Sequence, residues 1–312
     1  MLKHAGQYSF ELPEETHAQI ELQTIPQKAI AQAETAALVR QRREERDQDV
    51  AFGARPFILC GLPIRSLPPG TNRYTRRNGR FFLEIVGHPD YGVPFGQDRL
   101  VLIWVATLAI RHQTPIVEFD SASGILWEFG LPPNGIHYKR LAEAFKRVFG
   151  STIFFGTETE MERGQVWDCG RSHFFDQMKL WFREDGRGSK LGNRIVLSDN
   201  FWRELKAHPI PVDCEVVRAL ASNPGCLDLY TWLTWRCFQA KNTVERIPLF
   251  GPFGLSNQLG VGEYARERKF RERLRVWLNI VQVYWPECPA AVSKNGNFLE
   301  LNRACAVSPL QR

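Results

Sequence analysis

The densest set of chemically useful side chains lies near the C-terminus, where six cations fall within ten residues. They are Arg266, Arg268, Lys269, Arg271, Arg273 and Arg275. An arginine guanidinium can form paired hydrogen bonds to a phosphate group or to the O6 and N7 edge of guanine, and a lysine ammonium pairs with phosphate as a point charge. The cluster therefore indicates a surface for an anionic polymer such as double-stranded DNA.

The apolar residues around these cations predict a helix over residues 263–285, with Pro286 ending it. Its apolar positions have the spacing 4, 3, 1 and 3, which places them on one helical face. They are Phe270, Leu274, Trp277, Leu278 and Val281. One face of the predicted helix therefore packs on a core while the N-terminal half presents the cations to solvent. Helix-turn-helix proteins present the N-terminal part of their second helix to the major groove in this way.

A β-hairpin is predicted directly after this helix. Ala291–Ser293 and Phe298–Leu301 flank the turn Lys294-Asn295-Gly296-Asn297, and Asn-Gly between strand formers is a strong hairpin signal because both residues tolerate positive φ. Lys294, Asn295 and Asn297 at its tip are expected to touch the DNA backbone or a flanking groove as a wing.

Two other interpretations of the basic helix remain open. It could be a solvated surface carrying i,i+4 pairs such as Glu267–Arg271. It could also belong to an interaction module that binds an acidic protein. Salt dependence separates these from DNA binding, because phosphate contacts make log K fall steeply and linearly with log salt.

A similar order is predicted earlier in the chain. A buried helix from Asp98, its expected N-cap, to His112 is followed by a short strand at 115–119 and a helix near 121–129. Next comes an amphipathic helix capped by Asn134 that runs to Phe149, with Gly150 in the C′ position.

The last of these helices is basic and precedes a predicted two-stranded ribbon. The ribbon consists of Thr152–Phe155 and Gln165–Cys169, joined by the polar connection 156–164. The helix carries Lys139, Arg140, Lys146 and Arg147, a second candidate DNA contact. This first unit either contacts DNA or mainly forms a dimer. A separate Asn78-Gly79 hairpin carries four more cations, namely Arg73, Arg76, Arg77 and Arg80.

The chain divides into three predicted parts. A Gly-rich, charged break at 183–193 indicates a boundary between two domains, 53–190 and 191–312. Residues 1–52 form a polar N-terminal segment with a helical stretch near 27–46, and order is expected to begin near Phe57. The segment is interpreted as a flexible tail or solvated helix, with a basic arm on DNA as the alternative.

Composition narrows the class of protein. The 312 residues are 44% hydrophobic and carry a formal net charge of +6, which suits a folded protein with an anionic partner. The seven Cys are scattered without a C-x-x-C pair, so neither a disulfide framework nor a zinc site is expected. With no secretory signal and no apolar run long enough to cross a bilayer, a cytoplasmic location is expected.

Catalytic motifs are missing from the sequence. It has neither a G-x-x-x-x-G-K-[ST] loop nor an H-E-x-x-H pair, and no glycine cluster has dinucleotide-binding spacing after a strand. We therefore expect a protein without catalysis of its own and without a cofactor or metal.

Several short segments, taken in order, resemble plasmid-encoded RepA replication initiators of the broad-host-range kind. They are Arg76-Arg77-Asn78-Gly79-Arg80, His88-Pro89, Gly92-Val93-Pro94-Phe95-Gly96, Arg99 with Ala109-Ile110-Arg111, Glu128-Phe129-Gly130-Leu131, Arg140-Leu141 with Phe145-Lys146-Arg147-Val148-Phe149, and Leu227-Asp228-Leu229-Tyr230-Thr231-Trp232-Leu233-Thr234-Trp235-Arg236. The resemblance covers roughly residues 55–285. It implies two winged-helix domains that bind repeated sites at a plasmid origin, opening of nearby A·T-rich DNA, and loading of the host helicase.

The sequence thus predicts an α+β protein with two tandem winged-helix domains behind a polar, partly helical N-terminal segment. Its expected partners are repeated double-stranded origin sites, a second copy in a homodimer, and host replication proteins such as the replicative helicase. The alternative function is a DNA-binding transcriptional regulator, including one that only represses its own operon.

Overall fold

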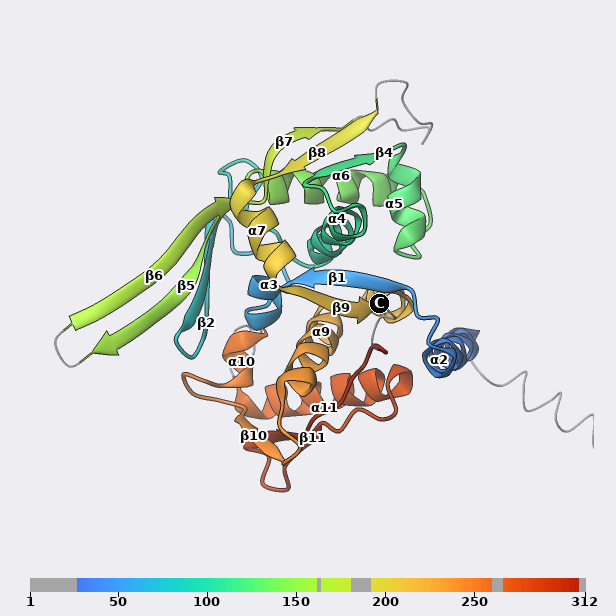
Figure 1. The fold of residues 1–312 in the computed structure, drawn as a ribbon, viewed down its shortest axis with the longest axis vertical. Coiled ribbons are helices and arrows are strands. Elements are labelled where there is room, and N and C mark those ends of the chain that lie inside the picture. Colours follow the sequence, from blue (N-terminus) through green and yellow to red (C-terminus); the bar gives the residue numbers. More distant parts are fainter. Residues whose placement is uncertain (1–26, 162–163, 181–191, 260–265, 309–312) are drawn as a thin grey trace, which may run out of the picture.

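The computed structural model describes residues 27–161, 164–180, 192–259 and 266–308 and shows a mixed α+β protein (Figure 1). The first described elements are helix α2 (Gln27–Glu45), strand β1 (Val50–Ala54), the short helix α3 (Arg55–Leu59) and the hairpin strands β2 (Arg73–Asn78) and β3 (Phe81–Val86). The expected turn between β2 and β3 is present, with Gly79 at φ +61°.

One order of elements occurs twice. The first copy is α4 (Asp98–His112), β4 (Ile116–Phe119), α5 (Ala122–Glu128), α6 (Gly135–Phe149), β7 (Phe175–Lys179) and β8 (Asn193–Leu197). The second is α9 (Pro224–Gln239), β10 (Glu245–Pro248), α10 (Leu255–Gln258), α11 (Glu267–Tyr284), β11 (Ala291–Val292) and β12 (Phe298–Leu301). Both sheets are antiparallel and have the same strand order, β4-β8-β7 and β10-β12-β11. We call these the first and second units.

The ribbon expected after α6 differs from the prediction. Its strands are longer, β5 (Thr152–Met161) and β6 (Gly164–His173), so most of the expected connection 156–164 is itself strand. They join β2 and β3 in a separate sheet, β2-β3-β5-β6, whose long hairpin projects from the body (Figure 1). In the first unit, β7 and β8 are therefore the strands that correspond to the β11–β12 hairpin of the second unit.

The expected domain boundary also does not follow the strand pairing. Residues 181–191 lie outside the described residues, but β7 before them pairs with β8 after them, from Phe175↔Leu197 to Lys179↔Arg194. β8 pairs with β4 as well. The Gly-rich stretch therefore connects two paired strands of one sheet, and a division at 190/191 would separate β8 from its sheet.

The N-terminal segment is more integrated than expected, because order begins well before Phe57. β1 is largely buried and pairs with β9 (Pro209–Asp213) along its whole length. Helix α2 packs against α8 (Cys214–Leu220) and α11, and its charge run forms ion pairs with both regions. Arg42 contacts Glu215 at 3.0 Å and Arg43 contacts Glu287 at 2.9 Å. Residues 1–26 of the predicted tail lie outside the described residues.

Two details at helix ends differ from the prediction, while Asn134 caps α6 as expected by accepting from the His137 N–H. Asp98 is the first residue of α4 rather than its N-cap, which is Gln97, because the Asp98 carboxylate is bound elsewhere. Gly150 has φ −76°, so its backbone is not in the left-handed region that favours glycine. A Cβ at Gly150 would lie 2.8 Å from the His88 Cβ, so close packing requires glycine.

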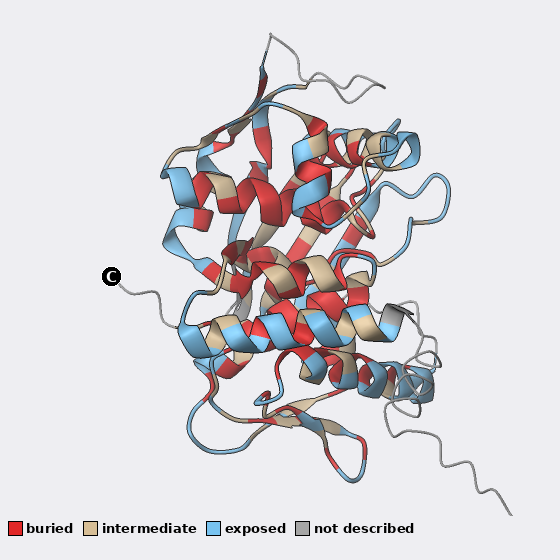
Figure 2. Cartoon of the chain, turned by 90° about the vertical axis from the view of Figure 1, so that its right-hand side faces the viewer, coloured by how far each residue is buried: buried red, intermediate tan, exposed pale blue. Residues whose placement is uncertain are grey.

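The buried side chains form one continuous core through both units (Figure 2). Helix α4 is buried almost all round, as predicted, and α9 is similar. Between them lies a buried ion pair: the Arg99 Nε and the Asp228 Oδ1 are 2.7 Å apart, and Arg99 also donates to the Leu62 carbonyl at 3.0 Å. Burial raises the pKa of Asp228 to about 6 although Arg99 opposes this. Arg99 and Asp228 both come from the segments that resemble RepA initiators, and here they join the two units.

Candidate nucleic-acid interface

Helix α11 has the predicted amphipathic form and carries the cation cluster. Its described part begins at Glu267, with Arg266 at the N-cap position, and the predicted first residues 263–265 lie outside the described residues. The expected apolar stripe is buried: Phe270, Leu274, Trp277, Leu278 and Val281, joined by Tyr284. This stripe anchors the helix, so the cations on its other sides face solvent or the β11–β12 hairpin.

Arg271 differs from its neighbours because it binds the protein itself. Its Nε donates to the Gly296 carbonyl in the hairpin turn at 2.7 Å, and its guanidinium lies over the Phe250 ring, 4.7 Å from the centroid. It also pairs with Glu267 at 2.9 Å, the i,i+4 contact expected from the sequence. Arg271 therefore holds the hairpin against the helix and is a positioning residue.

The other five cations of the cluster are exposed. Arg268 faces Glu272 at 3.6 Å, and both side chains are mostly in solvent, so the pair holds the arginine only weakly. Within the part of the chain that the structure describes, the remaining four have no ion-pair partner: Arg266, Lys269, Arg273 and Arg275. These residues create a positive surface that is free to meet an anion.

The β11–β12 hairpin forms where expected, and its three candidate residues have different roles. Gly296 has φ +70°, which closes the turn. Asn295 builds that turn, because its Oδ1 accepts from the Ser293 hydroxyl at 2.8 Å and from the Asn297 N–H at 3.1 Å. Lys294 is exposed and extends the positive surface beyond the helix. The Asn297 Oδ1 accepts from the Arg271 guanidinium at 3.4 Å, so Asn297 contacts the helix.

The first unit supplies fewer free cations than expected. Arg147 forms a two-pronged ion pair with the buried Asp98, at 2.6 and 2.9 Å, and lies over the Phe95 ring. The expectation that Arg147 faces DNA is therefore not met, because its charge is neutralised inside the fold. Lys139, Arg140 and Lys146 stay exposed on α6.

The cations of the β2–β3 hairpin are mostly engaged within the protein. Arg73 pairs with Glu84 at 2.7 Å, and Arg77 pairs with Glu158 of the neighbouring strand β5 at 2.5 Å. Arg76 donates to the Tyr74 hydroxyl and lies over the same ring. This hairpin is thus a weaker anion site than its sequence indicates.

Sequence reasoning missed a stripe of residues other than the cations on the outer face of α11. Val276 is 49% exposed and Val283 is 38% exposed. On the same face, Asn279 lies between the two valines and Glu272 lies one turn before Val276. The sequence contained a signal for this stripe. The four positions have the helical spacing 4, 3 and 4, and along the sequence they alternate with the buried positions of the apolar stripe.

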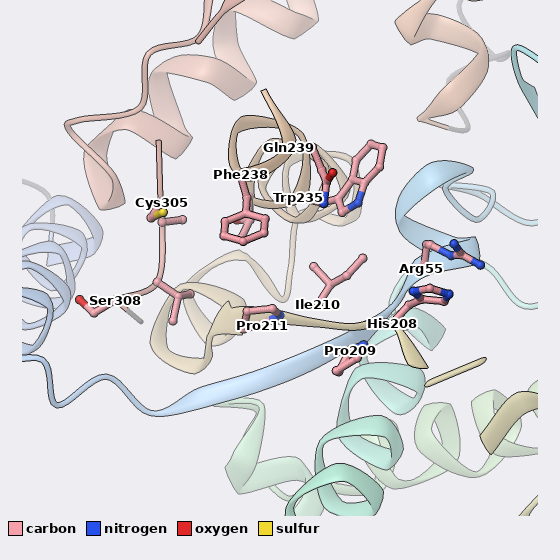
Figure 3. Close-up of a pocket in the computed structure, with 13 residues that line it drawn as sticks. Arg55, His208, Pro209, Ile210, Pro211, Trp235, Phe238, Gln239, Cys305 and Ser308 are labelled. Carbon is pink, nitrogen blue, oxygen red and sulfur yellow. The ribbon is translucent and has the colours of Figure 1, made fainter. Parts of the chain in front are cut away.

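An apolar groove of about 490 Å³ lies elsewhere, between β9, α9 and the C-terminal segment (Figure 3). Phe238, which is 56% exposed, and Trp235 line one wall, and Pro209 and Pro211 line the other. Its one arginine, Arg55, is bound to Glu204 at 2.8 and 3.1 Å. The groove is not part of the positive surface on α11.

The described residues offer neither a membrane-spanning helix nor a metal-binding cluster. None of the helices described is long and apolar enough to cross a membrane. No group of three or more His, Cys, Asp or Glu side chains within the described ranges is placed to hold a metal ion. Five of the seven Cys are buried, and burial raises the pKa of Cys60, Cys214 and Cys226 to about 12, as expected for thiols used as core side chains.

Comparison with known proteins identifies the family that this chain resembles. Residues 124–247 match the model of the family described as Plasmid encoded RepA protein, which confirms the resemblance seen in the sequence. This match supports a role as an initiator of a plasmid or similar replicon. No curated protein matches the chain.

Two solved structures match this chain. The crystal structure of domain 2 and domain 3 of RctB, as its SeMet derivative, has a TM-score of 0.51 at 14% identity and covers 81% of this chain and 99% of that chain. A second structure of RctB domains 2-3 has a TM-score of 0.45 at 13% identity and covers 75% of this chain and 92% of that chain. At such identities the first likeness concerns the fold alone, and it agrees with the predicted α+β class.

Proposed function

We propose that this protein is a non-catalytic replication initiator of the plasmid RepA type that binds repeated double-stranded DNA sites at an origin. The observation that carries the proposal is the exposed positive surface of α11, which lies beside a β-hairpin in a unit that occurs twice in the chain. Melting of adjacent DNA and loading of the host helicase, in contact with host replication proteins, complete the proposed role.

Both units are proposed to be winged helices. The order helix, strand, helix, helix, strand, strand, with the first strand pairing with the last, brings the third helix and the final hairpin together. In helix-turn-helix proteins the second helix of the motif enters the major groove, and this helix corresponds to the third helix of each unit. In this chain the corresponding helices are α6 and α11, and both carry exposed cations. The domains are accordingly proposed to divide after β8 rather than at 190/191.

The second unit is proposed as the main DNA-binding unit. Its helix and hairpin together expose Arg266, Arg268, Lys269, Arg273, Arg275 and Lys294. In the first unit, Lys139, Arg140 and Lys146 are exposed, and Lys146 also lies 5.9 Å from the centroid of the Tyr91 ring. This thinner surface suits a supporting DNA contact or a contact with a second copy. Binding at adjacent repeats bends DNA, and bending favours unstacking at flexible steps nearby.

Fluorescence anisotropy on labelled duplexes tiled across the DNA that flanks the gene tests DNA binding. We expect strong preference for a directly repeated segment and a loss of affinity on the order of 10³-fold between about 50 and 200 mM salt, the loss typical of six or so phosphate contacts. Arg273→Ala with Arg275→Ala should lower the slope of log K against log salt by about 2. Lys206→Ala, an exposed cation on α7 (Asp199–Ala207), is the matched control and should leave the slope unchanged.

Weak binding to all tiles that is insensitive to salt would refute the DNA-binding role and favour an interaction module with an acidic protein partner. Initiation is tested separately by maintenance of a plasmid that carries the repeated segment and depends on this protein. If the protein binds the repeats but does not support maintenance, it is a transcriptional regulator and the initiator role fails.

A further inference from the structure

The outward face of α11 carries a stripe of residues whose chemistry differs from that of the cations. Glu272, Val276, Asn279 and Val283 are all exposed and have the spacing 4, 3 and 4. The buried residues Phe270, Leu274, Trp277 and Val281 have the same spacing two positions earlier. Two residues turn a helix by about 200°, so the exposed stripe lies opposite the buried one.

The cations of α11 flank this stripe on both sides. Arg271 contacts the hairpin, so the side of the helix that carries Arg268 and Arg275 is the side near β11 and β12. Lys269 and Arg273 lie on the other side of the stripe, because each residue turns the helix by about 100°. A helix that enters the major groove with this outer face first would direct the two sets of cations toward the two phosphate backbones.

We infer that Glu272, Val276, Asn279 and Val283 read base edges while the flanking cations bind phosphate, an inference that rests on the proposed DNA-binding function. Each residue type has a matching base edge in the major groove. Asparagine pairs with adenine N6 and N7, glutamate accepts from cytosine N4, and apolar side chains contact the thymine methyl group.

The two valines support this assignment independently of charge. Exposed single valines are common on proteins, but Val276 and Val283 are seven residues apart, two helical turns, on the face that the basic residues frame. Thymine presents a methyl group in the major groove, and covering it removes apolar surface from water. The stripe therefore selects a site that contains A·T pairs together with a C·G pair opposite Glu272.

The test compares sequence selection by the full-length chain and by three variants. The wild type, Glu272→Gln, Asn279→Ala and Val276→Ala each select from a randomised duplex library at about 150 mM salt. We expect a defined consensus for the wild type. Asn279→Ala should lose discrimination for adenine at one position, and Glu272→Gln should lose it for cytosine at another. Each loss should be about 5- to 150-fold, with little change in affinity for unrelated duplex.

A uracil substitution tests the valine contact. Replacing thymines of the consensus one at a time with deoxyuridine removes only the methyl group, which should weaken the wild type about fourfold at one position. At that position Val276→Ala should bind the thymine and the deoxyuridine duplex with equal affinity. Val244→Ala is the matched control, because Val244 is 64% exposed but precedes β10 and is not part of α11, and it should behave as wild type.

The outcomes separate this inference from the proposed function. If the wild type selects a consensus and all three variants select it with unchanged discrimination, the DNA-binding function stands but the assignment of the stripe is wrong. If the wild type binds duplex DNA without sequence preference, the assignment is again wrong. If the wild type binds no duplex, the proposed function itself fails and the inference fails with it.

Discussion

Replacing Arg271 with alanine should destabilise the protein, whereas replacing Arg273, two residues away, should not. The Arg271 side chain is 25% exposed, donates to the Gly296 carbonyl at 2.7 Å and lies 4.7 Å from the centroid of the Phe250 ring. Arg273 is exposed and has no partner within the part of the chain that the structure describes. The same change in charge thus has two different structural consequences.

The magnitude follows from the contacts that are lost. A hydrogen bond from a charged group contributes about 1.5–3 kcal/mol, and a partly desolvated cation–π contact adds about 0.5–2 kcal/mol. Arg271→Ala should therefore lower the free energy of unfolding by about 2–5 kcal/mol. Arg273→Ala should stay within about 0.5 kcal/mol of wild type, as is usual for a surface substitution.

Urea unfolding of both variants measures this difference, with salt-dependent DNA binding as the second assay. Arg271→Lys keeps the positive charge but loses the directed Nε–H and the planar stacking, so it should be nearly as unstable as Arg271→Ala. Arg273→Ala should lower the slope of log K against log salt by about 1 without loss of stability. If Arg271→Ala unfolds within about 0.5 kcal/mol of Arg273→Ala, the hairpin is not held by this side chain and the reasoning is refuted.

Three further substitutions test the packing of the fold. Gly225→Ala should lower the free energy of unfolding by about 1–3 kcal/mol or more, because a Cβ there would lie 2.2 Å from the Trp277 ring. Gly135→Ala is the control and should be nearly neutral, because the space around its Cβ position is open. Thermal unfolding of both variants measures the difference. Arg147→Ala should cost about 3–5 kcal/mol in urea unfolding, since it leaves a buried carboxylate unpaired; a surface-like cost below about 1 kcal/mol would contradict this. The pKa of Asp228 is raised to about 6, so its protonated form is favoured in the folded state. The wild type should therefore lose stability relative to Asp228→Asn as pH rises from about 4 to 6; a constant difference across that range would show that the pKa is not raised.

Local signals in the sequence were sufficient for most elements. The helix at α11, its buried stripe, the Asn134 cap and both Asn-Gly hairpins depend on residues close together in the chain, and all are present. The RepA resemblance likewise depended on the order of short segments, and the family match over 124–247 confirms it.

Two predictions that the structure contradicts concern the pairing of strands. The Gly-rich stretch before Asn193 has the composition of a linker, but composition does not show whether the strands on either side pair with each other, as β7 and β8 do. The polar segment 156–164 likewise has the composition of a loop. It is mostly strand because its neighbour in the β5–β6 hairpin satisfies its backbone hydrogen bonds.

The sequence by itself determined the classes of side chain at the proposed interface, the helix that carries them and the hairpin that follows. Only the tertiary structure decided which cations are free. Arg147 and Arg271 resemble their neighbours in the sequence, yet one is neutralised by Asp98 and the other is bound to the turn at Gly296. The physical reason is that a charge is neutralised by partners that folding brings within a few ångströms, and those partners lie 49 and 25 positions away along the chain.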